Sequence, residues 1–216
     1  MNRQVLKEMA ESEPHYRQAG EIIRSGGLVI LPTETFYALA ADPFKEEAVR
    51  RIFGIKRRDQ TKPLALIASD RASVAKLVLR MSPLAEELAD CFWPGSLTIL
   101  LEPSRPVSPL LTGPSGKIGV RVPPQCPAGI VAADAGGWLT ATSANLSGDL
   151  DPDDVSKIAK EVLDDVDLVM DLGRTPGGKP STVVEPLDDH FRILRKGAVP
   201  LSAIAACCNR RRFKHQ

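Results

Sequence analysis

Residues 53–68, FGIKRRDQTKPLALIA, place a dense run of positive charge between two apolar segments. The residues before the charges end a pattern of apolar side chains at helical spacing, and PLALIA after them is the continuous apolar run of a buried strand. Four charges fall within seven residues: Lys56, Arg57, Arg58 and Lys62. A charge run usually lies on a solvated face. This one is fixed between a helix and a strand, which favours the binding of an anion.

Outward from this stretch, helical and strand-like patterns alternate in the first half of the chain, and strand-like patterns crowd together in the second. The helical patterns cover residues 16–27, 45–56, 69–80, 82–92 and 151–166. The strand-like patterns cover residues 28–32, 63–68, 96–102, 117–123, 138–144, 168–173, 181–186 and 191–197. This order predicts an α/β fold (α+β in some schemes) with three layers, in which helices cover both faces of a mixed β-sheet.

The composition is that of an ordinary globular domain. Of the 216 residues, 43% are hydrophobic and 25% are charged, which is enough to bury a core in one domain. The 28 Lys and Arg residues nearly balance the 27 Asp and Glu residues, for a formal net charge of +1. A protein that works by nonspecific binding of RNA or DNA is usually far more basic. Anion recognition in this chain must therefore be local.

Cysteine and histidine residues show no metal-site or catalytic-triad pattern. The cysteines are Cys91, Cys126, Cys207 and Cys208, with no pair of CxxC motifs for zinc, and the three histidines are scattered. Because adjacent Cys207 and Cys208 are a poor disulfide pair, we expect a reduced, cytoplasmic chain. The N-terminal residues lack the apolar region of a secretion signal, and no segment approaches the roughly 18 apolar residues of a membrane span.

Small polar and cationic residues gather at or near the ends of several predicted strands. They are Thr33 and Thr35, on either side of Glu34; Thr142, Ser143, Asn145 and Ser147; Arg121; and Arg195. Such positions line the ligand crevice of an α/β sheet. The hydroxyl groups could cap local turns or cradle phosphate oxygens. Each arginine could be solvated or could clamp a carboxylate. Together they indicate a site that binds phosphate and carboxylate and acts by positioning and charge stabilisation, as in nucleotidyl transfer.

The stretch GRTPGGKPS, residues 173–181, nearly matches the phosphate loop G-x-x-x-x-G-K-[ST]. Pro180 stands where a Ser or Thr hydroxyl should coordinate magnesium. The strand-like STVVE follows where a phosphate loop needs the N-terminus of a helix. We therefore interpret this stretch as a Gly-rich turn that leads into a strand.

Seven segments, in this order, resemble the YrdC-like family of threonylcarbamoyl-AMP synthases. They are PTETFYALAADP, IKRRDQTKPLALI, WPGSLTILL, GVRVP, TSANLSG, PSTVVE and ILRKGAV, within roughly residues 15–200. The combination of K-x-R and S-x-N, with WPG between them, is specific. The resemblance implies a twisted mixed sheet with helices on both faces and a concave, positive cavity. It also implies condensation of L-threonine, bicarbonate and ATP to threonylcarbamoyl-AMP and pyrophosphate, with Mg²⁺ expected through ATP.

The resemblance also implies roles for individual residues. Lys56 and Arg58 match K-x-R and are the expected catalytic pair. The residues that match ATP-binding positions are Lys56, Arg58, Ser143, Asn145 and Arg195. The residues that match threonine-binding positions are Thr33, Arg121 and Ser181, with Arg121 suited to the carboxylate. Partner proteins of the family then move the threonylcarbamoyl group to an adenosine beside the anticodon of certain tRNAs.

The chain departs from the family pattern at several positions. Ala38 and Ala40 replace two glycines, Asp59 replaces a proline after K-x-R, Ile67 stands where longer relatives have a histidine, and Lys117 replaces a small polar residue. The stretch after TSANLSG is acidic, so the family's contacts there are not carried over. The chain has no length for the second domain of the long relatives, so we expect the short, stand-alone form.

Residues 1–205 are expected to form a single YrdC-like domain, followed by a flexible basic tail at residues 206–216. The tail could be solvated or could contact tRNA weakly. An RNA-binding or ribosome-assembly protein on the same fold is the main alternative, although aromatic residues for stacking are few, at 5%. A carbamoyl-transfer module of hydrogenase maturation and a nucleotide binder without synthase activity are further alternatives. The chain lacks the CxxC motifs of the hydrogenase-maturation proteins. The intact K-x-R and S-x-N motifs disfavour a nucleotide binder without synthase activity.

Overall fold

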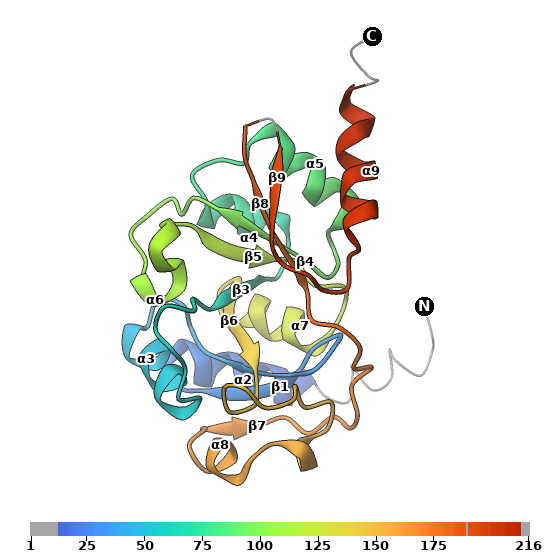
Figure 1. Cartoon of the computed structure of the whole chain (residues 1–216). Helices are drawn as coiled ribbons and strands as arrows, with labels where there is room; N and C mark the ends of the chain where they lie inside the picture. Colours follow the sequence, from blue (N-terminus) through green and yellow to red (C-terminus); the bar gives the residue numbers. More distant parts are fainter. Residues whose placement is uncertain (1–12, 189, 213–216) are drawn as a thin grey trace.

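The computed structural model describes residues 13–188 and 190–212 (Figure 1). The strands are β1 (Val29–Pro32), β2 (Tyr37–Ala40), β3 (Ala65–Ala68), β4 (Leu97–Leu101), β5 (Ile118–Arg121), β6 (Trp138–Ser143), β7 (Leu168–Val169), β8 (Thr182–Pro186) and β9 (Phe191–Arg195). The α-helices are α2 (Glu13–Arg24), α3 (Glu46–Ile55), α4 (Arg71–Leu77), α5 (Pro83–Phe92), α6 (Pro109–Thr112), α7 (Pro127–Asp134), α8 (Lys160–Asp164) and α9 (Leu201–Arg212). Short 3₁₀ turns occur at Gly113–Ser115 and Val155–Lys157.

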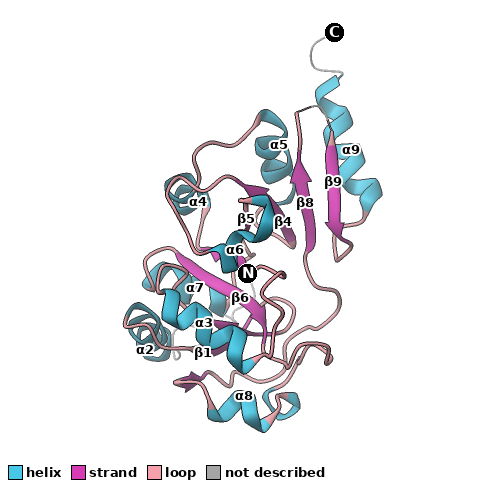
Figure 2. Cartoon of the chain, turned by 60° about the vertical axis from the view of Figure 1, so that its left-hand side comes forward, coloured by secondary structure: helices cyan, strands magenta, loops and turns pink. Residues whose placement is uncertain are grey.

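The strands form one mixed sheet in the order β7-β1-β2-β6-β3-β5-β4-β8-β9. The pairs β1–β7, β3–β5 and β4–β8 are parallel, and the other neighbours are antiparallel. Figure 2 shows this sheet running from β1 at one end to β8 and β9 at the other. The predicted mixed sheet is confirmed. Because β2 and β6 meet at its centre, residues from both halves of the sequence become neighbours.

Two apolar cores lie on opposite faces of the sheet. Side chains of successive strand residues point to opposite faces, so Val29 and Leu31 join one core while Leu28 and Ile30 join the other. The first core contains residues of α2 and α7, and the second contains residues of α3, α4 and α5. Each fully buried Leu or Ile side chain contributes roughly 1.5–3 kcal/mol. The expected three-layer arrangement is therefore the observed one.

Several elements differ from the predictions, among them the short helix α6, which we did not expect. We did not expect β2, which is short and becomes a strand by pairing with both β1 and β6. We also did not expect α7, which begins with Pro127 in its first turn. The helix expected over 151–166 is wrong for most of its length, because the carbonyls of Pro152 and Asp153 accept hydrogen bonds from the amides of Tyr37 and Thr175, each 2.8 Å long. In a helix these carbonyls would instead accept hydrogen bonds from the amides four residues ahead.

The C-terminal segment differs from the expected tail. Helix α9 runs through Arg212, so the boundary that we placed after residue 205 falls inside a helix, and residues 213–216 lie outside the described part. A disulfide joins Cys91 of α5 to Cys207 of α9. The expectation of a fully reduced chain is wrong for this pair. Packing of α5 against α9 brings the two Cα atoms within 6.5 Å across 116 residues of sequence, which spacing alone does not reveal.

No helix within the described residues combines the length and the apolar character that crossing a membrane requires.

Candidate functional site

A cavity of about 740 Å³ opens beside the central strands, within the usual range for small-molecule sites. Its walls come from the loop after β1, the segment between α3 and β3, and strands β5, β6, β8 and β9. Six predicted site residues line it: Thr33, Arg58, Arg121, Ser143, Ser181 and Arg195. The expectation that polar residues near strand ends converge on one crevice is confirmed for five of these, and Arg58 reaches the same cavity from the segment between α3 and β3.

Lys56 and Asn145 lie behind the cavity wall and do not line it. The Lys56 side chain is buried, with 1% of the residue exposed. Its ammonium donates hydrogen bonds to the Ser143 carbonyl, to the Asn145 carbonyl (2.6 Å) and to Asn145 Oδ1 (2.8 Å). An ammonium group has three donors, so these oxygens occupy all of them. Lys56 therefore anchors the loop that carries Ser143, and its direct contact with an anion stays a prediction.

The loop that Lys56 anchors is braced from within. Ser143 Oγ donates to Asn145 Oδ1 (2.6 Å), and Asn145 Nδ2 donates to the Asp149 carbonyl (2.7 Å) and to Asp151 Oδ1 (3.3 Å). Burial, together with the charge of Arg58, lowers the pKa of Lys56 to about 8. Asp151 and Asp149 oppose this shift. The acidic stretch, which we had left without a role, thus supplies Asp151 to the cavity lining.

Two arginines of the cavity wall form no ion pair with a carboxylate of the described residues. Arg58 donates to the carbonyls of Lys62 (2.8 Å) and Pro63 (3.2 Å). Arg195 donates to the Ser181 carbonyl (2.8 and 3.1 Å) and to Ser181 Oγ (3.0 Å). Burial lowers the pKa of both side chains, and Arg195 lowers that of Arg58 further. Two cations held close together by neutral carbonyls make a site for an anion of high charge.

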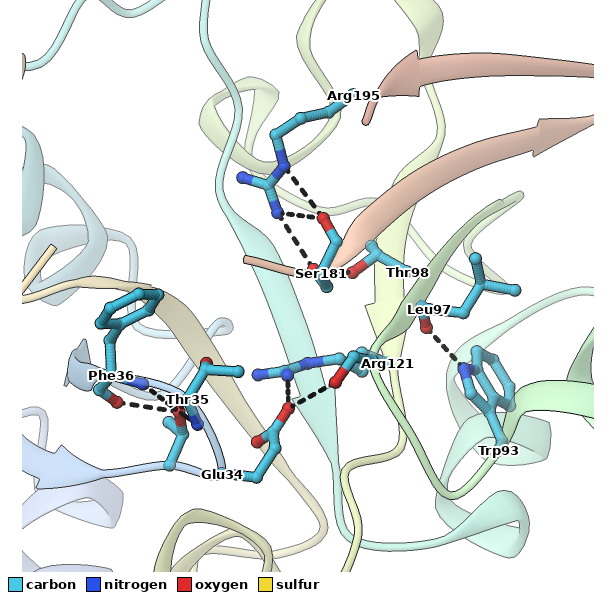
Figure 3. Close-up of polar contacts among 11 residues, drawn as sticks. Glu34, Thr35, Phe36, Trp93, Leu97, Thr98, Arg121, Ser181 and Arg195 are labelled. Atoms are coloured by element: carbon cyan, nitrogen blue, oxygen red, sulfur yellow. Dashed lines mark hydrogen bonds and ion pairs between the residues drawn. The ribbon is translucent and has the colours of Figure 1, made fainter. Parts of the chain in front are cut away.

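Arg121 is held in a different way, by a buried carboxylate (Figure 3). Its Nη1 donates to Glu34 Oε1, and the two side chains are only 9% and 12% exposed. Burial lowers the pKa of Arg121 to about 10, so its guanidinium stays charged at neutral pH. We did not predict Glu34 as a site residue. The signal was present, because an acidic residue between two threonines directly after a buried strand is itself an unusual pattern.

The hydroxyl groups of Thr33 and Ser181 already have hydrogen-bond partners, and Figure 3 shows Ser181 beside Thr98 and Arg195. Thr33 Oγ1 donates to the Phe36 carbonyl (2.8 Å) and accepts from the amides of Thr35 (3.1 Å) and Phe36 (3.2 Å). Thr98 Oγ1 and Ser181 Oγ lie 2.8 Å apart. Thr33 thus closes a local turn at the cavity wall, so one of its two predicted roles is observed. Its contact with a ligand stays a prediction.

The far wall of the cavity carries a three-residue ion-pair cluster. Glu185 accepts from Lys117 (2.9 Å) and from Arg192 (2.6 and 3.1 Å), and these partners lower the pKa of its carboxyl group. Lys117 is one of the departures from the family pattern. Glu185 pairs with both Lys117 and Arg192, so this cluster of two cations and one carboxylate keeps one net positive charge.

The near match to a phosphate loop is a turn, as we interpreted it. Gly173, Gly177 and Gly178 adopt positive φ angles, and the chain then enters β8 with no helix after Lys179. Ser181, at the start of that strand, is the residue of this stretch whose hydroxyl reaches Arg195.

Comparisons with known proteins agree with this geometry. Residues 21–197 match the family model Sua5_yciO_yrdC, described as "Telomere recombination". A putative threonylcarbamoyl-AMP synthase of Methanocaldococcus jannaschii is 37% identical over 185 residues, which cover 86% of each chain. The structure of P. abyssi Sua5 complexed with L-threonine superposes with a TM-score of 0.83 at 34% identity, covering 89% of this chain and 56% of that one. E. coli YciO superposes with a TM-score of 0.79 at 27% identity, covering 88% and 93%.

Proposed function

The chain belongs to the family of Sua5, YciO and YrdC proteins, and on that basis we propose that it is a threonylcarbamoyl-AMP synthase. The observation that carries the proposal is the set of arginines in the cavity wall. Among the described residues, Arg58 and Arg195 form no direct ion pair with a carboxylate, which suits a triphosphate, whereas Arg121, held by Glu34, is suited to a carboxylate. A relative that bears this name aligns over 86% of each chain, and one structural neighbour was solved with L-threonine. The enzyme class is nucleotidyltransferase.

The reaction proceeds in two steps. The threonine nitrogen attacks the bicarbonate carbon, water leaves, and a carbamate forms. A carbamate oxygen then attacks the α-phosphorus of ATP in line, and pyrophosphate leaves. Arg58 and Arg195 bind the triphosphate, Ser143 fixes its register, and Lys56 keeps the Ser143 loop in place. Aligning the carbamate with the α-phosphorus can lower the barrier by roughly 7–11 kcal/mol.

Mg²⁺ would enter with ATP. The described residues contain no group of three or more carboxylate, histidine or cysteine side chains suited to a metal, so this part of the chain supplies no complete set of metal ligands. A magnesium ion held mainly by substrate phosphates needs only one or two carboxylates. Asp151 fits this requirement, because it lines the cavity and its charge acts on Arg195. When bound, the ion would neutralise charge on the leaving pyrophosphate.

The product is a reactive mixed anhydride, which fits a role as an intermediate. We propose that cytoplasmic tRNA-modifying partner proteins transfer the threonylcarbamoyl group to adenosine next to the anticodon. Any direct contact of this chain with tRNA would be weak, since its net charge is only +1.

The decisive assay measures pyrophosphate release from ATP with L-threonine and bicarbonate, omitting each substrate in turn and separating the nucleotide products. We expect release that requires both, together with a new adenylate. Release independent of threonine would contradict the proposal. Salt-sensitive RNA binding without any threonine-dependent product would favour the RNA-binding alternative.

The pKa of Lys56 gives a pH dependence. Protonated Lys56 favours a polyanion nearby, so affinity for a non-reactive α,β-methylene analogue of ATP should fall as the pH rises through about 8. If the bound analogue raises this pKa by one unit, the affinity falls by roughly tenfold. Calorimetric titration between pH 7.5 and 9.5 measures the effect. Lys62→Met, which removes an exposed cation from the same stretch, should keep the midpoint; a flat profile in the unmodified protein would refute the link to Lys56.

A further inference from the structure

We infer that Glu34 determines specificity for the α-ammonium group of the amino-acid substrate. This inference rests on the proposed function and deepens it. Arg121 lines the cavity and Glu34 lies behind it, so a substrate carboxylate at Arg121 meets the field of a negative charge that an adjacent α-ammonium offsets.

The first support is the state of Arg121. Among the described residues, only its Nη1 has a hydrogen-bond partner, although a guanidinium has five N–H donors. Its other side-chain nitrogens are not among the fully buried atoms that lack a partner, and the residue lines the cavity. The free donors are therefore accessible from the cavity, where a substrate carboxylate can reach them. Glu34 is outside the lining and holds Arg121 from behind.

The second support is the state of Glu34. Its Oε1 faces Arg121 and lies 3.5 Å from Ser96 Oγ. Its Oε2 is buried and has no hydrogen-bond partner. A buried carboxylate oxygen without a donor is costly. A substrate ammonium beside Arg121 brings positive charge close to this carboxylate, although Oε2 itself does not face the cavity.

The charges around the cavity explain why the ammonium group of the substrate affects binding. Arg58 and Arg195 favour any anion. Glu34 neutralises Arg121, so a simple carboxylate anion gains little from the pair and meets a buried negative charge behind it. A zwitterion carries its own compensating ammonium and does not suffer this repulsion. The site thereby rejects carboxylic acids that have the shape of threonine but no amino group.

The test compares two ligands that differ only in that group: L-threonine and (R)-3-hydroxybutyrate. Calorimetric titration of the full chain should show at least about tenfold tighter binding of threonine. Glu34→Gln, which keeps the shape of the side chain, should lower threonine affinity by about tenfold and leave (R)-3-hydroxybutyrate binding equal or tighter. Glu34→Asp, which keeps the charge, should recover part of the preference.

Each outcome decides a different point. If Glu34→Gln weakens both ligands equally, Glu34 only positions Arg121 and the inference is overturned. If the affinity of neither ligand changes, Glu34 has no part in recognition and the inference is likewise overturned. If the unmodified protein binds no threonine at all, the proposed function fails, and the inference fails with it. Binding of the ATP analogue, unaffected by Glu34→Gln, shows that the variant is folded.

Discussion

Replacing Lys56 with alanine is expected to lower threonine-dependent pyrophosphate release by at least about a hundredfold, because the loop that holds Ser143 at the cavity wall loses its anchor; an effect of this size is seen when one donor to a transition-state anion is lost. The change should also lower the free energy of unfolding by roughly 3 kcal/mol. The buried ammonium satisfies three oxygens of the Ser143–Asn145 loop, and each buried acceptor left unsatisfied costs roughly 1–3 kcal/mol. Water entering the space left by the side chain offsets part of that cost.

Turnover and urea unfolding, measured on the same preparations, separate the two effects. Lys62→Ala is the matched control. It removes an exposed cation from the same cationic stretch, and its free energy of unfolding should stay within about 0.5 kcal/mol of the unmodified protein. Near-normal turnover in Lys56→Ala would show that Lys56 is not needed for the reaction. Lost turnover with unchanged stability would instead indicate that Lys56 contacts the nucleotide directly.

Replacing Arg121 with alanine should raise the KM for L-threonine by at least roughly a hundredfold, because truncating one member of a buried, hydrogen-bonded charge pair costs about 2–5 kcal/mol. The ATP analogue should bind almost normally, since Arg58 and Arg195 remain. The protein should also be destabilised by roughly 3–5 kcal/mol, because Glu34 becomes a buried charge without a partner. Initial rates at varied threonine concentration, with thermal unfolding in parallel, measure both.

Two controls sharpen this prediction. Arg192→Ala also removes an arginine from the cavity wall, but that side chain is 64% exposed and its partner Glu185 keeps Lys117. The expected cost is roughly 0–1 kcal/mol. The double variant Arg121→Leu with Glu34→Leu removes both charges, so stability should recover while threonine binding should not. Recovery of threonine binding in the double variant would show that Arg121 is not the carboxylate clamp.

Much of the fold could be predicted from local patterns. Apolar runs such as 28–32 and 63–68 became buried strands, because a strand buried on both faces needs no polar alternation. Strand β2 could not be predicted in this way. Its four residues are a strand because β1 and β6 pair with its two edges, and β6 lies about a hundred residues later in the chain. The broken helix near Pro152 has the same cause, since its carbonyls bond to distant amides.

The candidate site shows the same division. The chemical character of the cavity followed from residue types, because cations and hydroxyl groups at strand ends converge wherever those strands share an edge. The position of Lys56 could not be foreseen, since its burial depends on a loop 87–89 residues away. Glu34 was missed for a related reason. Local sequence shows an acidic residue in a turn, and only the folded structure shows that it pairs with Arg121, 87 residues later.

The separation between Lys56 and its partners also orders events during synthesis on the ribosome. At about 5–20 residues per second, roughly 4–18 s pass between the synthesis of Lys56 and that of Asn145. Until then the ammonium has none of its three acceptors, and one edge of β2 lacks β6. An unpaired strand edge is a template for association with other chains. The growing chain therefore passes through an interval in which β2 has an open edge. This interval ends when β6 pairs with β2 and neutral carbonyls surround the buried charge.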